Sequence, residues 1–177
     1  MDPAKYTYPW PLEGYGEQEP LPEVQLTDKS IENPQTNKLS SSYTTFTTPL
    51  ANGIRGAFDI HIYYSHHDEQ ETAFARALWE RIRREFPELR IYKFWDRPVG
   101  PHFITMFEVN LFTPAQFGAF VPWLAINRGP LSVLIHPNTV NEQGEAAEDE
   151  EERNHTQRAL WMGERLPVRT KVFHKGR

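Results

Sequence analysis

The residues in this chain that are best suited to chemistry are histidines and carboxylates on segments of alternating polarity. His61 follows Asp59 by two positions within the run AFDIHIYYS. His102 ends the Pro/Gly-rich stretch DRPVGPH, and His136 stands near the end of the apolar run LSVLIHP. Imidazole and carboxylate groups together suit Fe, Zn, Cu or Mn, and both can transfer protons. These residue types indicate a metal site or an acid–base site, provided that the fold brings them together.

The elements that carry these residues follow from the hydrophobic period. Alternating or β-rich runs predict four strands, at 57–65, 90–95, 104–112 and 131–137. Two helices are expected between them, over 71–86 and 115–127, with start signals at Asp68 and Thr113. The order β-α-β-β-α-β predicts a ferredoxin-like α+β fold, in which two helices cover one face of a four-stranded antiparallel sheet.

Alternation within the strands assigns residues to the two faces of the sheet. The apolar stripes expected under the helices are Ile60/Ile62/Tyr64, Phe107/Val109/Leu111 and Leu131/Val133/Ile135. The opposite stripes are Asp59/His61/Tyr63, Met106/Glu108/Asn110 and Ser132/Leu134/His136. We expect strands 57–65 and 104–112 to be parallel central neighbours, with strand 131–137 antiparallel beside the first.

This arrangement predicts that polar residues distant in sequence meet at one end of the helix-free face. The residues expected at that end are Asp59, His61, His102 and His136. Glu108 would lie farther along the same face, beside Tyr63. A facial set of imidazoles and a carboxylate with open positions is typical of non-haem Fe(II) oxygenases. A cluster of purely structural histidines is the alternative.

Two segments flank the core pattern. Residues 1–53 are dominated by Pro, Gly, Ser, Thr and Asn, and we interpret them as an irregular N-terminal extension that is either a disordered leader or a packing arm. Residues 54–177 then form the α+β domain. Within it, the acidic stretch 141–153 is expected to be a solvated loop or helix face, and 154–167 to be a short C-terminal helix.

Composition excludes several classes of function. The formal net charge of the 177-residue chain is −5, so no global basic field attracts nucleic acid or an anionic membrane. The sequence has no cysteine, which excludes disulfides, thiolate metal sites and cysteine nucleophiles. No apolar run approaches the roughly 20 residues that span a bilayer, and the N-terminus lacks a signal-peptide pattern. We therefore expect a cytoplasmic protein.

Five segments resemble the DOPA 4,5-dioxygenase family of fungi and bacteria. They are IHIYY, DRPVGPH, MFEVNL, NRGPLSVLIHP with the following NT, and NHTQRALWMGERLP, in the family's order. The resemblance implies a ferredoxin-like fold and extradiol cleavage of a catechol with Fe(II) and O2. It also implies that His61, His102 and His136 match the first-strand, GPH and HPxT motifs. His155 matches the histidine near the C-terminal helix.

The chain departs from the family pattern at two positions beside this chemistry. Family members often carry H-x-H-x-Y at the first strand, where this chain has Asp59 in place of the first histidine. The usual Asp-His pair before the last helix is Asn154-His155 here. The Asp59 carboxylate can bind a metal or serve as a base, whereas the Asn154 amide cannot be the anionic orienter of a histidine.

The leading hypothesis is an Fe(II)-dependent extradiol-type dioxygenase that cleaves a catechol or related phenolic compound with O2, in secondary metabolism. The expected metal ligands are His61, His102 and His136, with Asp59 or Glu108 as carboxylate replacements. His155 is the expected acid–base residue. The residues expected to line a flat aromatic pocket are Tyr63, Trp95, Trp123 and Trp161. The alternatives are a diverged cyclase, isomerase or decarboxylase, or a non-catalytic binding or dimerisation module.

Three expectations concern the surface. A homodimer is expected because the helix-free face would otherwise expose Leu134 and Met106. The pair His66-His67 is expected to be exposed in a loop, and His174 to lie in a frayed C-terminus.

Overall fold

The computed structural model describes residues 5–16 and 19–174. The chain divides into two units, Met1–Ser40 and Ser41–Arg177. In the described residues of the first unit, the chain forms an isolated bridge between Gln25 and Ile31 and no α-helix. The helices and strands that carry the candidate site all belong to the second unit.

Residues 46–52 contact the sheet of the second unit. The Phe46 ring packs on Phe58, with their centroids 5.5 Å apart. Leu50 forms a β-bridge with Thr139, in the segment that follows β4 (Val133–Pro137). The Ala51 amide donates a hydrogen bond of 2.8 Å to the neighbouring carbonyl oxygen of Asn138. The domain boundary that the sequence predicts after residue 53 stays a prediction about independent folding.

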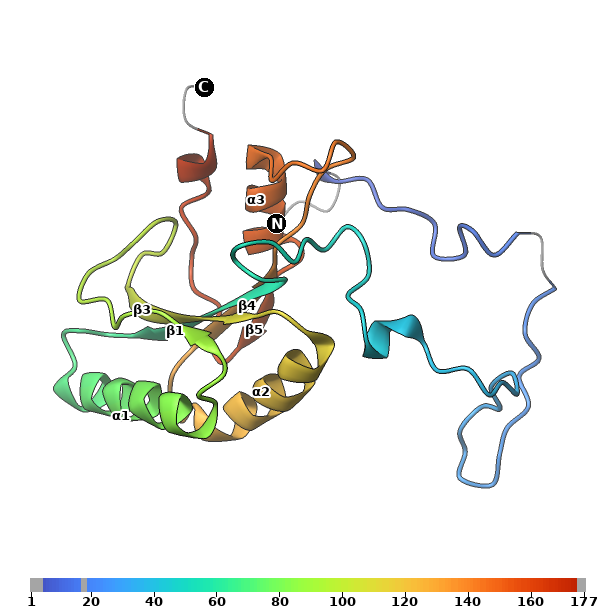
Figure 1. The fold of residues 1–177 in the computed structure, drawn as a ribbon, viewed down its shortest axis with the longest axis horizontal. Coiled ribbons are helices and arrows are strands. Elements are labelled where there is room, and N and C mark those ends of the chain that lie inside the picture. The colour runs from blue at the N-terminus through green and yellow to red at the C-terminus, as the bar shows by residue number, and fades with distance from the viewer. Residues whose placement is uncertain (1–4, 17–18, 175–177) are drawn as a thin grey trace. The chain divides into compact units, whose positions relative to one another are not determined.

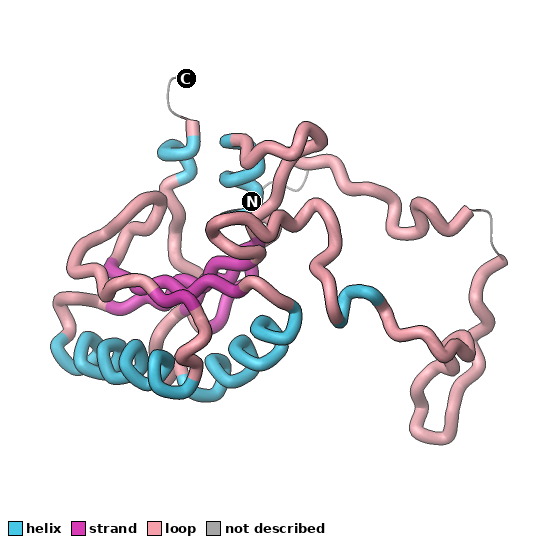
Figure 2. Tube along the Cα trace, viewed as in Figure 1, coloured by secondary structure: helices cyan, strands magenta, loops and turns pink. Residues whose placement is uncertain are grey.

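The second unit contains a five-stranded antiparallel sheet in the order β2-β3-β1-β4-β5 (Figure 1). Its strands are β1 (Phe58–Tyr64), β2 (Arg90–Ile91), β3 (Thr105–Leu111), β4 (Val133–Pro137) and β5 (Leu160–Met162). The helices are α1 (Glu69–Glu85), α2 (Pro114–Asn127) and α3 (Glu148–Thr156), with short 3-10 helices η2 (Ser41–Tyr43) and η3 (Thr170–Phe173). Helices α1 and α2 cover one face of the sheet, and α3 lies on the other side (Figures 1 and 2). The ferredoxin-like α+β prediction is confirmed, with a fifth strand added.

The predicted direction of the two central strands is wrong. Strands β1 and β3 are antiparallel, with Asp59 opposite Asn110 and Tyr63 opposite Met106. The crossover through α1 returns the chain as β2 in the direction of β1, because both strands run antiparallel to β3. The connection 92–104 then reverses the chain into β3. Strand β4 runs antiparallel to β1, as predicted.

The predicted helix over 154–167 is also wrong. Helix α3 begins earlier, at Glu148 within the acidic stretch, and ends at Thr156. The chain then forms β5, in which Trp161 pairs with Leu134 of β4. Strand β4 would otherwise be an open edge of the sheet, and β5 satisfies its backbone hydrogen-bonding groups.

The apolar stripes lie under the helices, as predicted. All nine stripe residues belong to one buried cluster with residues of α1 and α2. Helix α1 contributes Ala75, Leu78 and Ile82, which recur at helical spacing. The Asp68 side chain caps this helix by accepting hydrogen bonds from the amides of Gln70 and Glu71. The core therefore fixes the faces of β1, β3 and β4, and every second residue points to the side without α1 and α2.

The chain itself covers part of that second face. Leu134 is 0% exposed and Met106 is 3% exposed, because they pack with Tyr63 against Trp95 and Trp161. The expectation that these two side chains would be exposed without a second subunit or the N-terminal arm is therefore wrong, and the homodimer stays a prediction. Among the described residues, no helix is both long enough and apolar enough to cross a bilayer.

Candidate metal centre

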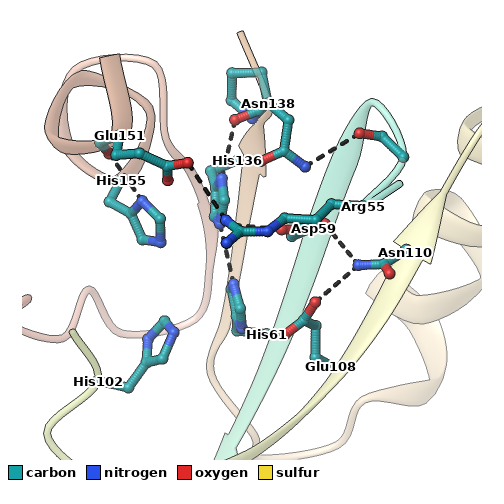
Figure 3. A network of polar contacts seen from close by, with 12 residues as sticks. Arg55, Asp59, His61, His102, Glu108, Asn110, His136, Asn138, Glu151 and His155 are labelled. Atoms are coloured by element: carbon teal, nitrogen blue, oxygen red, sulfur yellow. Dashed lines mark hydrogen bonds and ion pairs between the residues drawn. The ribbon is translucent and has the colours of Figure 1, made fainter. Parts of the chain in front are cut away.

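Four buried histidines converge on the sheet face opposite α1 and α2 (Figure 3). They come from four different segments: His61 from β1, His136 from β4, His102 from the connection before β3 and His155 from α3. The β1–β4 register places Asp59 opposite His136, and His61 lies two positions farther along β1, on the same face. Strand pairing thus brings His61 and His136 together, as the alternation predicted.

His102 reaches the cluster by a route that the sequence did not reveal. Because β1 and β3 are antiparallel, β3 begins opposite Tyr64, at the far end of β1. The connection folds back over the sheet face, where the Tyr63 hydroxyl lies 2.7 Å from Nδ1 of His102. The His102 ring centroid lies 4.2 Å from that of His61. Folding of the connection, and not a shared strand end, therefore brings His102 into the cluster.

Helix α3 presents His155 to the sheet by means of a buried polar network. Its two buried residues are Asn154 and His155, and neither is apolar. The Arg158 guanidinium donates hydrogen bonds to Thr139 Oγ1 (2.7 Å) and to Asn154 Oδ1 (3.2 Å). Asn154 thus anchors the helix to the segment that follows β4. The neighbouring His155 ring lies with its centroid 3.8 Å from that of His136.

Three of the histidines bring nitrogen atoms close to one another. Donor atoms of His61, His136 and His155 all lie within 4.8 Å of one another. The His136 Nδ1–H donates to the carbonyl oxygen of Pro137 (3.0 Å), and the His155 Nδ1–H donates to that of Glu151 (2.9 Å). Each of these rings therefore keeps the Nε2 lone pair for a ligand. His102 lies beside this group but outside it.

Burial keeps the four imidazoles neutral, which is the form that binds metals. Desolvation is the largest cause in each case, and it lowers the pKa of His102 to about 3 and that of His155 to about 4. It also lowers the pKa values of His61 and His136 well below the usual range. At neutral pH the cluster therefore presents lone pairs and no positive charge.

One contact within the cluster fits a bound cation better than a metal-free state. His61 Nε2 lies 3.0 Å from His136 Nε2, so one of the two must carry a proton for a hydrogen bond to form. Because His136 Nδ1–H is already donated to Pro137, the proton belongs on His61 Nε2, which leaves the buried His61 Nδ1 without a partner. If both Nε2 lone pairs were directed to a bound cation, neither Nε2 would need a proton and the conflict would be removed. His61 Nδ1 would then carry a proton that faces Glu108 Oε2, 3.9 Å away.

Two carboxyl groups adjoin the histidines. The Asn110 amide donates hydrogen bonds both to Asp59 Oδ1 (2.6 Å) and to Glu108 Oε1 (2.8 Å). Desolvation and then the nearby Glu108 raise the pKa of Asp59 to about 8, and desolvation also raises the pKa of Glu108. Asp59 Oδ2 lies 4.0 Å from His136 Nε2. The pair is therefore able to hold a proton beside the imidazoles at neutral pH.

A cavity of about 770 Å³ opens over the cluster. Its volume lies within the range of small-molecule sites, about 300–1,000 Å³. Of the four aromatic residues expected to line a pocket, Trp95 does so. Trp161 stacks on Tyr63 with centroids 5.8 Å apart, and Trp123 packs in the helix-covered core. The further lining residues that sequence reasoning missed include Arg55, Tyr92, Glu151 and Phe173.

The remaining histidines lie outside the site. His66 and His67 are exposed in the loop before α1, as predicted. The expectation that His174 is frayed is wrong, because His174 Nε2 lies 2.7 Å from Glu152 Oε2 of α3. This contact holds the end of η3 against α3, so that Phe173 packs on the His155 ring with centroids 4.8 Å apart.

Comparison with known proteins points to one family. The model of the Dopa 4,5-dioxygenase family matches residues 58–172, which include all four clustered histidines. An uncharacterized 21.2 kDa protein of Botryotinia fuckeliana is 64% identical over 168 residues, which cover 94% of this chain and 91% of that protein. DOPA 4,5-dioxygenase of Amanita muscaria is 28% identical over 140 residues, which cover 72% of this chain and 57% of the Amanita protein. The crystal structure of a proposed dioxygenase from Nostoc punctiforme matches with a TM-score of 0.52 and 26% identity, over 71% of this chain and 96% of that one.

Proposed function

Because this chain belongs to the Dopa 4,5-dioxygenase family, we propose that it is a non-haem Fe(II)-dependent extradiol-type dioxygenase that cleaves a catechol or related phenolic compound with O2. Family membership and the likeness to the Nostoc protein make the chain a dioxygenase-like oxidoreductase. The finer proposal is carried by one observation, the meeting of neutral imidazole donors from His61, His136 and His155 within 4.8 Å.

In this proposal, His61, His136 and His155 hold the iron. The sequence favoured His102 in place of His155 and gave His155 the acid–base role. We exchange the two roles, because a nitrogen of His155 lies within 4.8 Å of nitrogens of His61 and His136, while His102 stands outside this group. The bound Fe(II) would supply adjacent positions at which O2 and both oxygens of a catechol meet.

The proton chemistry then falls to His102 and Tyr63. The Tyr63 hydroxyl is hydrogen-bonded to Nδ1 of His102, which orients the ring and leaves Nε2 for a substrate hydroxyl. Burial lowers the pKa of His102 to about 3, so the ring is neutral, and with Nδ1–H donated to the Tyr63 oxygen its Nε2 lone pair is able to accept a hydrogen bond from a catechol hydroxyl. Burial also raises the pKa of Tyr63, which keeps its hydroxyl protonated.

A second candidate function is favoured by the carboxyl pair. Asp59 stands where the family often has histidine, and it lies buried beside the imidazoles, with the half-buried Glu108 sharing its Asn110 partner. A diverged isomerase, cyclase or decarboxylase would use this pair as an acid and a base in the same cavity, without O2 cleavage. The cytoplasmic location, the homodimer and the role in secondary metabolism expected from the sequence stay predictions.

An oxygen electrode separates these proposals. The protein is purified anaerobically, loaded with Fe(II), and mixed with simple catechols in air-saturated buffer. The dioxygenase proposal expects O2 uptake equal to the catechol consumed, with a ring-opened product identified by its mass. Catechol conversion without O2 uptake would support the acid–base alternative. No conversion across a panel of catechols would overturn the proposed substrate class.

A further inference from the structure

Arg55 is the one lysine or arginine among the described residues that line the cavity. It stands in the loop before β1, and its side chain extends over the strand toward Asp59 and His136 (Figure 3). The carboxyl groups that share the lining with it are those of Asp59, Glu108, Glu148 and Glu151. Without the guanidinium, the cavity would present only neutral and acidic groups to a ligand. Arg55 thus decides whether the cavity accepts an anion.

The present partner of Arg55 is weakly held. Its Nη1 lies 3.3 Å from Glu151 Oε1, and the Arg55 side chain is 66% exposed. Because water screens a guanidinium this exposed, the ion pair contributes little to stability. A guanidinium has five N–H donors in a planar fork that matches a carboxylate through two parallel hydrogen bonds. A carboxylate from a ligand therefore replaces the single Glu151 contact at small cost.

We infer that Arg55 is a specificity-determining residue that binds a carboxylate on the substrate's side chain, in exchange for Glu151. The inference rests on the proposed function, which places the two catechol oxygens at the histidines. With the catechol oxygens at the histidines, the aromatic ring lies among lining side chains such as Trp95 and Phe173. A substituent that extends from the ring toward solvent then meets Arg55.

The geometry also assigns a competing role to Glu151. Its backbone carbonyl accepts the hydrogen bond from His155 Nδ1, while its side chain pairs with Arg55. When a ligand carboxylate takes the guanidinium, the Glu151 side chain is released and its backbone contact with His155 stays in place. Loss of the Glu151 carboxylate should therefore strengthen binding of the anionic ligand, and only when Arg55 is present.

Binding measurements test the inference independently of turnover. The full-length protein is titrated anaerobically with 3,4-dihydroxyphenylacetate, with uncharged 4-methylcatechol and with dopamine, and binding is followed by tryptophan fluorescence. Arg55→Gln should weaken binding of the carboxylate ligand by about 10- to 100-fold, as expected for lost charge-assisted hydrogen bonds. The same change should leave 4-methylcatechol binding unchanged and should strengthen that of dopamine. Arg84→Gln is the matched control, because the Arg84 side chain is also largely exposed and forms an ion pair with Glu80 on α1.

Two further variants keep the test decisive if Arg55→Gln is unstable. Arg55→Lys keeps the charge but loses the fork, and should weaken binding of the carboxylate ligand by less than Arg55→Gln does. Glu151→Gln as a single substitution should tighten binding of the carboxylate ligand. Added to Arg55→Gln in a double variant, it should leave that binding unchanged. Equal weakening of all three ligands would mean that Arg55 only ties its loop to α3, and would overturn the inference. Carboxylate-selective binding without ring cleavage would instead refute the proposed function and leave the role of Arg55 standing.

Discussion

Acidification of the metal-free protein should destabilise it steeply between pH 6.5 and about 4. An unfolded histidine takes up a proton near pH 6.5. In the folded chain, burial lowers the pKa of His102 to about 3 and of His155 to about 4, with His61 and His136 also well below the usual range. The unfolded state therefore binds up to four more protons on these residues in that window, and the free energy of unfolding falls as pH falls.

The carboxyl pair acts in the opposite direction. Burial raises the pKa of Asp59 to about 8, so the folded state keeps a proton there that the unfolded state lacks above pH 4. Burial raises the pKa of Glu108 as well. The net difference is then about two to three protons, which corresponds to roughly 3–4 kcal/mol per pH unit. Because domains are stable by about 5–15 kcal/mol, two pH units suffice to unfold a protein of ordinary stability.

Urea titrations of the chelator-treated protein at pH 7.0, 6.0 and 5.0 measure this slope. His155→Gln should lower the slope by about one proton, because it removes one buried group that resists protonation. His66→Gln is the control and should leave the slope unchanged, since His66 is exposed. A free energy of unfolding that stays constant from pH 7 to 5 in the parent would refute the claim that the histidines are buried and neutral.

Three further predictions concern the site and its support. His102→Ala should retain iron while lowering kcat by about 10²- to 10⁴-fold, the range for a lost proton-transfer group, as measured with an oxygen electrode; an unchanged kcat would exclude the acid–base role. Asp59→His restores the residue that the family often carries, and should raise the rate of ring cleavage of simple catechols if Asp59 marks a shift in chemistry; equal rates would make the exchange neutral. Deletion of residues 1–40 should leave the melting temperature of the sheet domain nearly unchanged. Deletion of residues 1–53 should lower it by several degrees, because the bridge between Leu50 and Thr139 is lost. Equal melting temperatures of the two deletions would show that residues 41–53 do not support the domain.

Much of the site was predictable because alternation fixes the face of each strand residue. The core stripe of β1 leaves only one direction for His61, and the same argument places His136 and Glu108 on that face. Strand direction was less accessible, because β2 is only two residues long and the 92–104 connection has no periodic pattern. The prediction that His102 lies near His61 is therefore correct. The reason given for it, a shared strand end, is not, because the folded 92–104 connection carries His102 to this position.

Other features had no usable signal in the sequence. Helix α3 is held by polar contacts of Asn154 and Arg158, so it lacks the apolar period that would have revealed its start. Arg55 stands in an irregular loop, where neither period nor motif indicates a direction for the side chain. The choice between His102 and His155 as the third donor depends on backbone carbonyls that orient the rings, and those contacts exist only in the folded chain.

Metal content of the histidine variants tests the central claim most directly. Anaerobically purified parent protein, loaded with Fe(II) and freed of excess metal, is compared with His61→Ala, His136→Ala, His155→Ala and His102→Ala by elemental analysis. We expect about one iron per chain in the parent and in His102→Ala, and loss of iron in the other three, because removal of one of three protein ligands leaves the ion weakly held. Retention of iron by His155→Ala together with its loss from His102→Ala would contradict the proposed ligand set, and a parent that cleaves catechols with O2 while free of metal would contradict the iron site itself.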